Sequence, residues 1–83
     1  MKTKVALVMG GGAGTGRATA LAFVAEGATV IVADVNEDGG RETLAQVQAA
    51  GGHGLFVRAD MSEPGDVQNV VAQALQMFGG LHL

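Results

Sequence analysis

Short apolar runs alternate with longer segments of helical periodicity along the chain. The runs are residues 5–9, 29–33 and 55–57, and none shows the regular polar alternation of a strand with one solvent face. Continuous apolar runs of this length are typical of strands in a parallel sheet that is covered on both faces. We therefore predict three buried strands, the second ending at Asp34 and the third near Asp60.

Residues 14–26, between the first two runs, predict a helix. At about 100° per residue, its small and apolar positions gather on one face, which would let the helix approach a sheet closely. Gly27 follows this segment, as glycine often follows a helix C-terminus. The residues expected on the buried face are Gly14, Ala18, Leu21, Ala22 and Ala25.

Two further helices are predicted after the second and third runs. Residues 36–50 begin with acids, which suit the positive end of a helix, and carry Leu44 and Val47 as an apolar stripe. The last helix is expected to begin at Ser62 as N-cap, with Pro64 in its first turn. The other residues of these predictions are the acids Glu37 and Asp38, the terminating glycine pairs 51–52 and 79–80, and the buried stripe Val67, Val70, Val71, Ala74 and Phe78.

The resulting order is β-α-β-α-β-α, which predicts an α/β fold with a three-stranded parallel sheet and right-handed crossovers. The length of 83 residues allows one small domain, and a hydrophobic content of 48% excludes a disordered linker. The chain has no cysteine, which excludes a disulfide scaffold and a thiol nucleophile. It also has no tyrosine, which excludes any mechanism that uses a phenol within this sequence.

The charge pattern narrows the possible partners. The net charge is −3, and the five basic residues are scattered, so no basic face for nucleic acid is expected. No apolar run approaches the roughly 20 residues of a membrane span. The apolar run near the N-terminus is too short for a signal peptide. We therefore expect a soluble, cytoplasmic protein with no nucleic-acid or membrane partner.

Five glycines lie within residues 10–16, directly after the first predicted strand and at the start of the first predicted helix. Backbone N–H groups at a helix N-terminus are unpaired and attract anions. Glycines let the chain turn sharply and let a pyrophosphate approach without a Cβ in the way. We favour a phosphate-binding turn over a glycine-rich turn without a ligand. Its predicted residues are Gly10, Gly12, Gly14, Thr15 and Gly16.

The spacing of the glycines distinguishes between known phosphate-binding patterns. It fits G-x-x-x-G-x-G, starting from Gly10, and fails the strict G-x-G-x-x-G pattern. A P-loop is disfavoured because Arg17 stands at the position of its lysine and Ala18 at that of its Mg²⁺-binding hydroxyl. A methyl-donor site is disfavoured because no acid precedes Gly10.

Two acids follow the predicted strands at the carboxyl edge of the sheet, where open α/β sheets bind their ligands. Asp34 lies 18 residues after Gly16, close to the spacing of about 20 at which an acid binds the adenosine ribose in dinucleotide folds. An acid there repels a 2′-phosphate, so it favours NAD over NADP. By itself, Asp60 is equally compatible with a helix-capping or loop carboxylate.

The chain resembles the N-terminal part of the short-chain dehydrogenase/reductase family, in its single-domain branch. The resemblance rests on residues 5–16, 27–34 and 57–61, and the ending, residues 77–83, is similar to the family's approach to its fourth strand. It implies a Rossmann-type, partial doubly wound fold with NAD as cofactor. Two departures are Met9, where the family usually has Thr, and Thr15, where it usually has an aliphatic residue.

The resemblance also implies roles for individual residues. The glycine segment would hold the pyrophosphate, and Asp34 would hold the adenosine ribose. Asp60 and the backbone amide of Met61 would hold the adenine. The family's catalytic Ser, its Tyr-x-x-x-Lys pair and its Asn-rich segment have no counterpart here, and Ser62 is interpreted as a helix cap.

The sequence therefore predicts the nucleotide-binding half of an NAD-dependent oxidoreductase, without its catalytic residues and ending before the fourth strand. The alternative is a non-catalytic nucleotide-binding or assembly module that works as this half. In the family's sheet order the first strand is internal. In this chain it would be an exposed apolar edge, so we expect weak folding or self-association through that edge.

Overall fold

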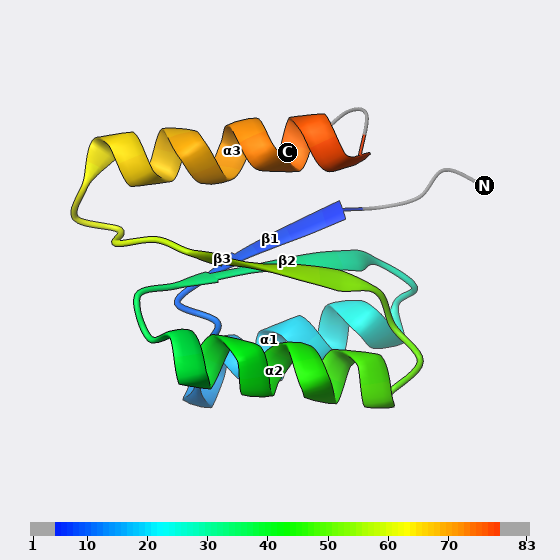
Figure 1. The fold of residues 1–83 in the computed structure, drawn as a ribbon. Coiled ribbons are helices and arrows are strands. Elements are labelled where there is room, and N and C mark those ends of the chain that lie inside the picture. The colour runs from blue at the N-terminus through cyan, green and yellow to red at the C-terminus, as the bar shows by residue number, and fades with distance from the viewer. Residues whose placement is uncertain (1–4, 79–83) are drawn as a thin grey trace.

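The computed structural model describes residues 5–78 as three strands and three helices in strict alternation. The order confirms the predicted β-α-β-α-β-α arrangement (Figure 1). The terminating glycine pair predicted at 79–80 lies outside the described residues. The elements are β1 (Val5–Met9), α1 (Gly14–Ala25), β2 (Thr29–Asp34), α2 (Glu37–Ala49), β3 (Gly54–Arg58) and α3 (Pro64–Phe78).

The three strands form a parallel sheet in the order β1-β2-β3. In the register of the strands, Val5 pairs with Thr29 and Val30 pairs with Gly54, so β2 is bonded on both edges. Its sequence, TVIVAD, is rich in the β-branched residues that suit a pleated and enclosed strand. Every residue of β2 before Asp34 is buried, as the apolar run predicts.

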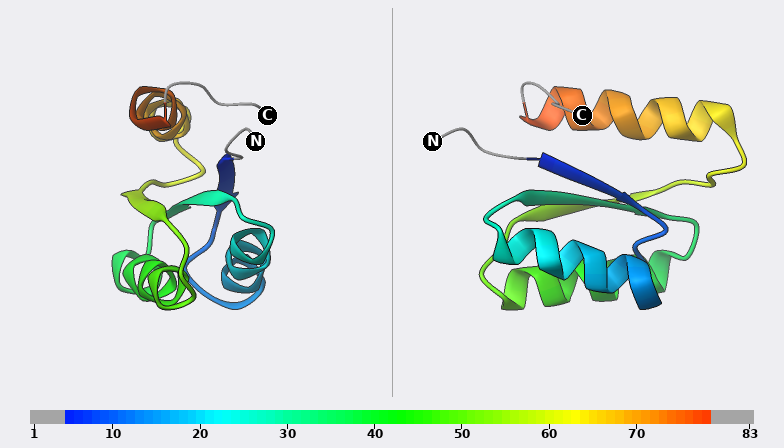
Figure 2. Two further views of the ribbon diagram at one scale, coloured as in Figure 1. Left: turned by 90° about the vertical axis from the view of Figure 1, so that its right-hand side faces the viewer. Right: turned by 180° about the vertical axis from the view of Figure 1, so that it is seen from behind.

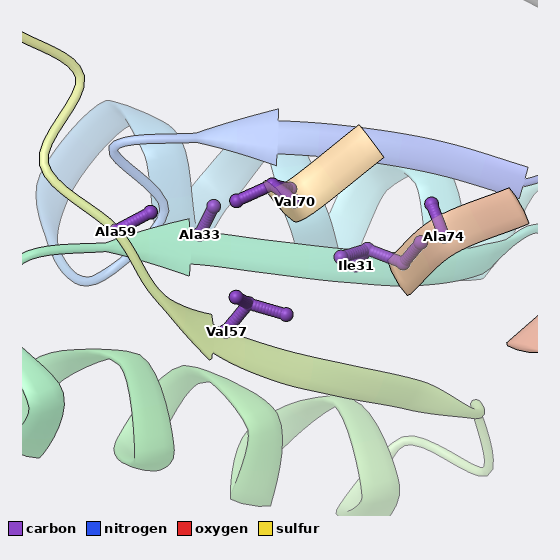
Figure 3. Packing of buried hydrophobic residues seen from close by; sticks show 6 residues of the cluster. All are labelled: Ile31, Ala33, Val57, Ala59, Val70 and Ala74. Carbon is purple, nitrogen blue, oxygen red and sulfur yellow. The ribbon is translucent and has the colours of Figure 1, made fainter. Parts of the chain in front are cut away.

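Helices cover both faces of the sheet, with α1 and α2 on one side and α3 on the other (Figures 1 and 2). Because successive side chains of a strand point to opposite faces, β2 supplies both cores. Val30 and Val32 pack with Ala20 on the side of α1. Ile31 and Ala33 face α3 (Figure 3). The cluster on the α3 side comprises Ile31, Ala33, Val57, Ala59, Val70 and Ala74.

The predicted buried face of α1 is wrong. Ala20 is fully buried and Val24 packs against the same cluster, whereas Gly14, Ala18, Ala22 and Ala25 are exposed and only Leu21 is half-buried. The helix is apolar on nearly every side, so periodicity does not select a face. Its rotation is set by backbone contact instead: a Cβ at Gly16 would overlap the carbonyl oxygen of Gly10.

The helix ends agree with the sequence except at the start of α3. Gly27 and Gly51 follow α1 and α2 with φ of +85° and +83°, the left-handed conformation that glycine adopts at a helix C-terminus. The side chain of Asn36 caps α2 by accepting the Gly39 N–H at 3.1 Å. The Ser62 prediction is wrong, because α3 begins at Pro64 and the Ser62 hydroxyl binds Asp60 instead.

None of the helices in residues 5–78 combines the length and the apolar character that a membrane crossing requires.

A close contact between α2 and β3 generates a prediction about stability. The ring of Phe56 fills the space that a Cβ at Gly40 would occupy. Gly40→Ala should therefore lower the free energy of unfolding by about 1–3 kcal/mol, because the ring must move from a packed position. The control is Gly65→Ala, where the added Cβ meets open space in the first turn of α3. Urea unfolding that gives equal stabilities for both variants would contradict the packing.

Candidate functional site

The glycine turn between β1 and α1 depends on the conformational freedom of glycine at two positions. Gly10 and Gly14 have φ of +74° and +57°, in the left-handed region that side chains disfavour. The N–H of Gly10 donates to the carbonyl oxygen of Ala33 at 2.7 Å, so the turn begins against the end of β2. At Gly16 a Cβ would overlap the carbonyl of Gly10, so the absence of a side chain at Gly16 lets the first turn of α1 pack against the start of the glycine turn.

The N-termini of α1 and α2 differ in whether side chains cap their free N–H groups. The N-cap residue of α1, Ala13, provides no side-chain hydrogen bond, and no acid lies in the first turn. In α2 the Asn36 side chain caps the helix, and Glu37 and Asp38 lie in its first turn. The N-terminus of α1 therefore keeps the unbonded N–H groups and the positive dipole end that attract an anion.

Asp34 connects β2 to the glycine turn. Its Oδ2 accepts the N–H of Gly12 at 2.8 Å, and its Oδ1 accepts the N–H of Asn36 at 3.0 Å. A Cβ at Gly12 would lie 2.6 Å from Oδ2, so this contact requires glycine. The structure thus brings together the two features that the sequence places 22 residues apart. A carboxylate has about four acceptor positions, so Asp34 retains acceptor capacity beyond these two bonds.

Asp60 lies after β3, in the loop that leads to α3. Its Oδ1 accepts both the hydroxyl and the backbone N–H of Ser62, at 2.7 and 2.9 Å. Its own N–H donates to Oδ2 of Asp66 in the first turn of α3. The hydrogen bond from the Ser62 hydroxyl, followed by that from its backbone and by the charge of Arg58, lowers the pKa of Asp60 against a smaller opposing effect of burial. Asp60 is therefore a firmly held carboxylate.

Three further side chains are exposed where the strands end. Met9 ends β1, Val35 follows Asp34, and Met61 follows Asp60, with 40%, 52% and 37% of their surfaces exposed. Parallel strands end at one edge of a sheet, so these apolar side chains lie along the edge that carries the glycine turn. Within residues 5–78, no group of three His, Asp or Glu side chains is arranged to hold a metal ion.

Arg17 makes contacts at the site that no sequence pattern predicts. Its Nη2 donates to the carbonyl oxygens of Gly12 and Gly39 at 2.8 and 3.2 Å, and its Nε donates to Thr43 Oγ1 at 2.9 Å. The Thr43 hydroxyl donates in turn to the carbonyl oxygen of Gly11 at 2.7 Å. The only signal in the sequence is a basic residue within an otherwise apolar α1. Two of its partners, Gly39 and Thr43, lie on α2 and are not indicated by any spacing.

A parallel sheet whose first strand leads through a glycine turn into an uncapped helix, with a carboxylate at the end of the second strand, is the arrangement of Rossmann-type nucleotide-binding domains. The sequence matches the short chain dehydrogenase family over residues 4–83, and the chain belongs to this family.

Similar proteins include characterised dehydrogenases. A 2,5-dichloro-2,5-cyclohexadiene-1,4-diol dehydrogenase of Sphingobium indicum is 44% identical over 78 residues, which cover 94% of this chain and 31% of the relative. A cyclohexanol dehydrogenase of an Acinetobacter species is 38% identical over 80 residues, covering 96% of this chain and 32% of the relative. The chain therefore spans about a third of the length of these curated relatives.

Solved structures of the family superpose closely on this chain. A short chain dehydrogenase/reductase from Burkholderia phymatum in complex with NAD gives a TM-score of 0.92 at 37% identity, covering 98% of this chain and 29% of that chain. An actinorhodin polyketide ketoreductase with NADPH gives a TM-score of 0.90 at 29% identity, covering 95% of this chain and 30% of that chain. Relatives of this fold thus bind either dinucleotide.

The hydrogen bonds around Asp60 predict how its titration responds to substitution. Removing the hydroxyl in Ser62→Ala should raise the Asp60 pKa toward the ordinary aspartate value, because the largest cause of the lowering is lost. Ser62→Thr keeps a hydroxyl and should preserve the lowered pKa. Carboxyl ¹³C chemical shifts recorded against pH measure both.

The same shift has a defined effect on stability. The pKa of Asp60 is lower in the folded protein than in the unfolded chain, so its ionised form stabilises the folded state. This stabilisation is fully present above the unfolded-state pKa, and it is lost as the pH falls through the folded-state pKa. An Asp60 pKa unchanged in Ser62→Ala would show that this hydrogen bond does not set it.

Proposed function

We propose that this chain forms the nucleotide-binding half of an NAD(H)-dependent short-chain oxidoreductase. In the intact parent, hydride would pass between the nicotinamide and an alcohol or carbonyl substrate. The observation that carries the proposal is the contact of Asp34 with the glycine turn, beside an α1 N-terminus that has no cap of its own. Together they offer an anion site and a ribose acceptor a few ångströms apart.

The glycine turn is assigned to the pyrophosphate. Unbonded N–H groups at the start of α1 would donate to phosphate oxygens, and the helix dipole would favour their negative charge. Positions without a Cβ let the phosphates approach the backbone. Thr15, although not aliphatic, still offers its backbone N–H. The residues assigned to the phosphate-binding turn are Gly10, Gly12, Gly14, Thr15 and Gly16. The N–H groups of Gly10 and Gly12 are bonded to Ala33 and Asp34, so the donors assigned to phosphate are those of Gly14, Thr15 and Gly16.

Asp34 is assigned to the adenosine ribose and to the preference for NAD. Its remaining acceptor positions suit the two ribose hydroxyls, and its charge would repel a 2′-phosphate. The guanidinium of Arg17 donates to the carbonyl oxygens of Gly12 and Gly39 and not to the Asp34 carboxylate, which leaves the acceptor positions of Asp34 for the ribose. The carboxylate of Asp60 and the backbone N–H of Met61 are assigned to the adenine.

We further propose that the catalytic residues belong to a part of the protein beyond this sequence, which would end before the fourth strand. Two observations support this: the curated relatives are about three times as long, and the chain contains no tyrosine. A Tyr-x-x-x-Lys pattern and an Asn-rich strand end in the downstream coding region would support an enzyme. A stop codon there would favour the non-catalytic module instead.

Cofactor preference gives the direct test of the Asp34 assignment. In the full-length protein, isothermal titration should show tighter binding of NAD than of NADP. Asp34→Asn keeps an oxygen for the Gly12 N–H but removes the charge, and Asp34→Ala removes both. Both variants should narrow the NAD preference by about tenfold or more, since hydrogen bonds to charged groups contribute about 1.5–3 kcal/mol.

The matched control for this test is Glu26→Gln, which removes one negative charge at the far end of α1. It should leave the ratio of the two dissociation constants unchanged. Equal or tighter binding of NADP by the unsubstituted protein would contradict the role of Asp34.

A separate proposal concerns the 83-residue chain by itself. Within the described residues β1 is paired only with β2, so its other edge presents unpaired backbone groups, and Val5 and Leu7 beside that edge are only half-buried. We expect self-association through this edge. Sedimentation equilibrium should show a mass that increases with micromolar concentration. A monomer at every concentration with a cooperative thermal transition would contradict it.

A further inference from the structure

Two peptide groups of the glycine turn are fixed by the side chains of Thr43 and Arg17, neither of which belongs to the G-x-x-x-G-x-G pattern. The carbonyl oxygen of Gly11 accepts the Thr43 hydroxyl at 2.7 Å, and that of Gly12 accepts Arg17 Nη2 at 2.8 Å. Thr43 is completely buried in α2, and Arg17 is partly buried in α1. The guanidinium of Arg17 also links α1 to α2, because it donates to Thr43 Oγ1 and to the Gly39 carbonyl oxygen.

A hydrogen bond that holds the carbonyl of a peptide group also fixes the direction of the N–H in the same peptide group. In a trans peptide the C=O of one residue and the N–H of the next point in opposite directions. Thr43 holds the Gly11 carbonyl, and the N–H on the other side of that peptide, from Gly12, donates to Asp34. Arg17 holds the Gly12 carbonyl, so the N–H of Ala13, an exposed residue, points away from Arg17.

We propose that Arg17, supported by Thr43, is a positioning residue for the phosphate-binding turn. It fixes the Gly12–Ala13 peptide at the N-cap of α1, and so directs the Ala13 N–H and the start of the helix that follows toward the pyrophosphate. Arginine suits this role because its planar guanidinium presents several donors at fixed angles and serves three acceptors at once. A lysine in its place has one nitrogen and cannot reproduce that arrangement. This inference rests on the proposed nucleotide-binding function.

The proposal also accounts for the departure at Met9, which offers no hydroxyl to brace the turn. In this chain the bracing bonds come from β2, α1 and α2 instead. The turn is held at Gly10 by the backbone of Ala33, at Gly11 by Thr43 and at Gly12 by Asp34 and Arg17.

A series of truncated ligands separates positioning from general loss of structure. Dissociation constants of the full-length protein for NAD, ADP and adenosine are measured by titration, with ligand-observed NMR for adenosine. Arg17→Met should weaken NAD and ADP at least tenfold while changing adenosine less than twofold, because adenosine has no phosphate to meet the turn. Arg17→Lys should fall between Arg17→Met and the unsubstituted protein.

Two further variants complete the experiment. Thr43→Val should weaken ADP less than Arg17→Met, and the double variant should be no weaker than Arg17→Met alone, since both act on one network. The control is Arg41→Met on α2, whose guanidinium pairs with Glu37 at the surface and should not affect any of the three ligands.

The outcomes distinguish this proposal from the proposed function. If the unsubstituted protein does not bind NAD, the nucleotide-binding proposal itself fails. If it binds NAD, and Arg17→Met weakens adenosine as much as ADP or weakens neither, the positioning role is overturned. If Arg17→Met does not fold, the ratio of adenosine to ADP affinity in Arg17→Lys decides: an unchanged ratio overturns the role, and a lowered preference for ADP supports it.

Discussion

The whole molecule depends on the enclosure of β2. This strand is bonded to β1 and β3 along its two edges and covered by helices on its two faces, so its side chains alternate between two cores. Val30 and Val32 belong to one core, and Ile31 and Ala33 belong to the other. All four of these consecutive residues are fully buried, and each contributes about 25 cal/mol per Å² of apolar surface removed from water.

The position of the candidate site follows from this enclosure. Because β2 is fixed on all sides, its last residue, Asp34, has a defined place at the carboxyl edge of the sheet. The Gly10 N–H binds the carbonyl oxygen of Ala33, and the Gly12 N–H binds the Asp34 carboxylate. The glycine turn is therefore hydrogen-bonded to β2, the strand that is enclosed on all sides. This attachment suits a site that would present several N–H groups at once.

Much of the fold could be predicted from the sequence, because apolar runs and glycines report strands and helix ends directly. β1 and the end of β2 lie where their apolar runs predict, and the close approach of Asp34 to the glycine turn follows from strand topology. The buried face of α1 was not predictable, because nearly all of its positions are small or apolar. There, the rotation follows from contacts of Gly16 and Ala20 that only the folded chain makes.

The hydrogen bonds that hold the site were less predictable than its members. The contact of Arg17 with Thr43 joins residues 26 positions apart on two helices, and no spacing rule connects them. Ser62 is of a residue type that is common at helix N-caps, but its hydroxyl binds the carboxylate of Asp60 and the helix starts at Pro64. The partner of Arg17 is therefore a tertiary one that no local pattern indicates, whereas the partner of Ser62 is local, an Asp two residues earlier, and it competes with the helix N-terminus for the same hydroxyl.

The uncapped start of α1 has a thermodynamic consequence. A helix end without a side-chain cap forgoes about 1 kcal/mol that Ser, Asp or Asn would contribute in its place. An anion bound there supplies the missing partners, so binding and folding of this region become linked equilibria. A ligand at about 100 times its dissociation constant stabilises the folded state by about 2.7 kcal/mol. The stability of this domain would then follow the cellular concentration of its ligand, and the unliganded form would be the first to unfold or be degraded.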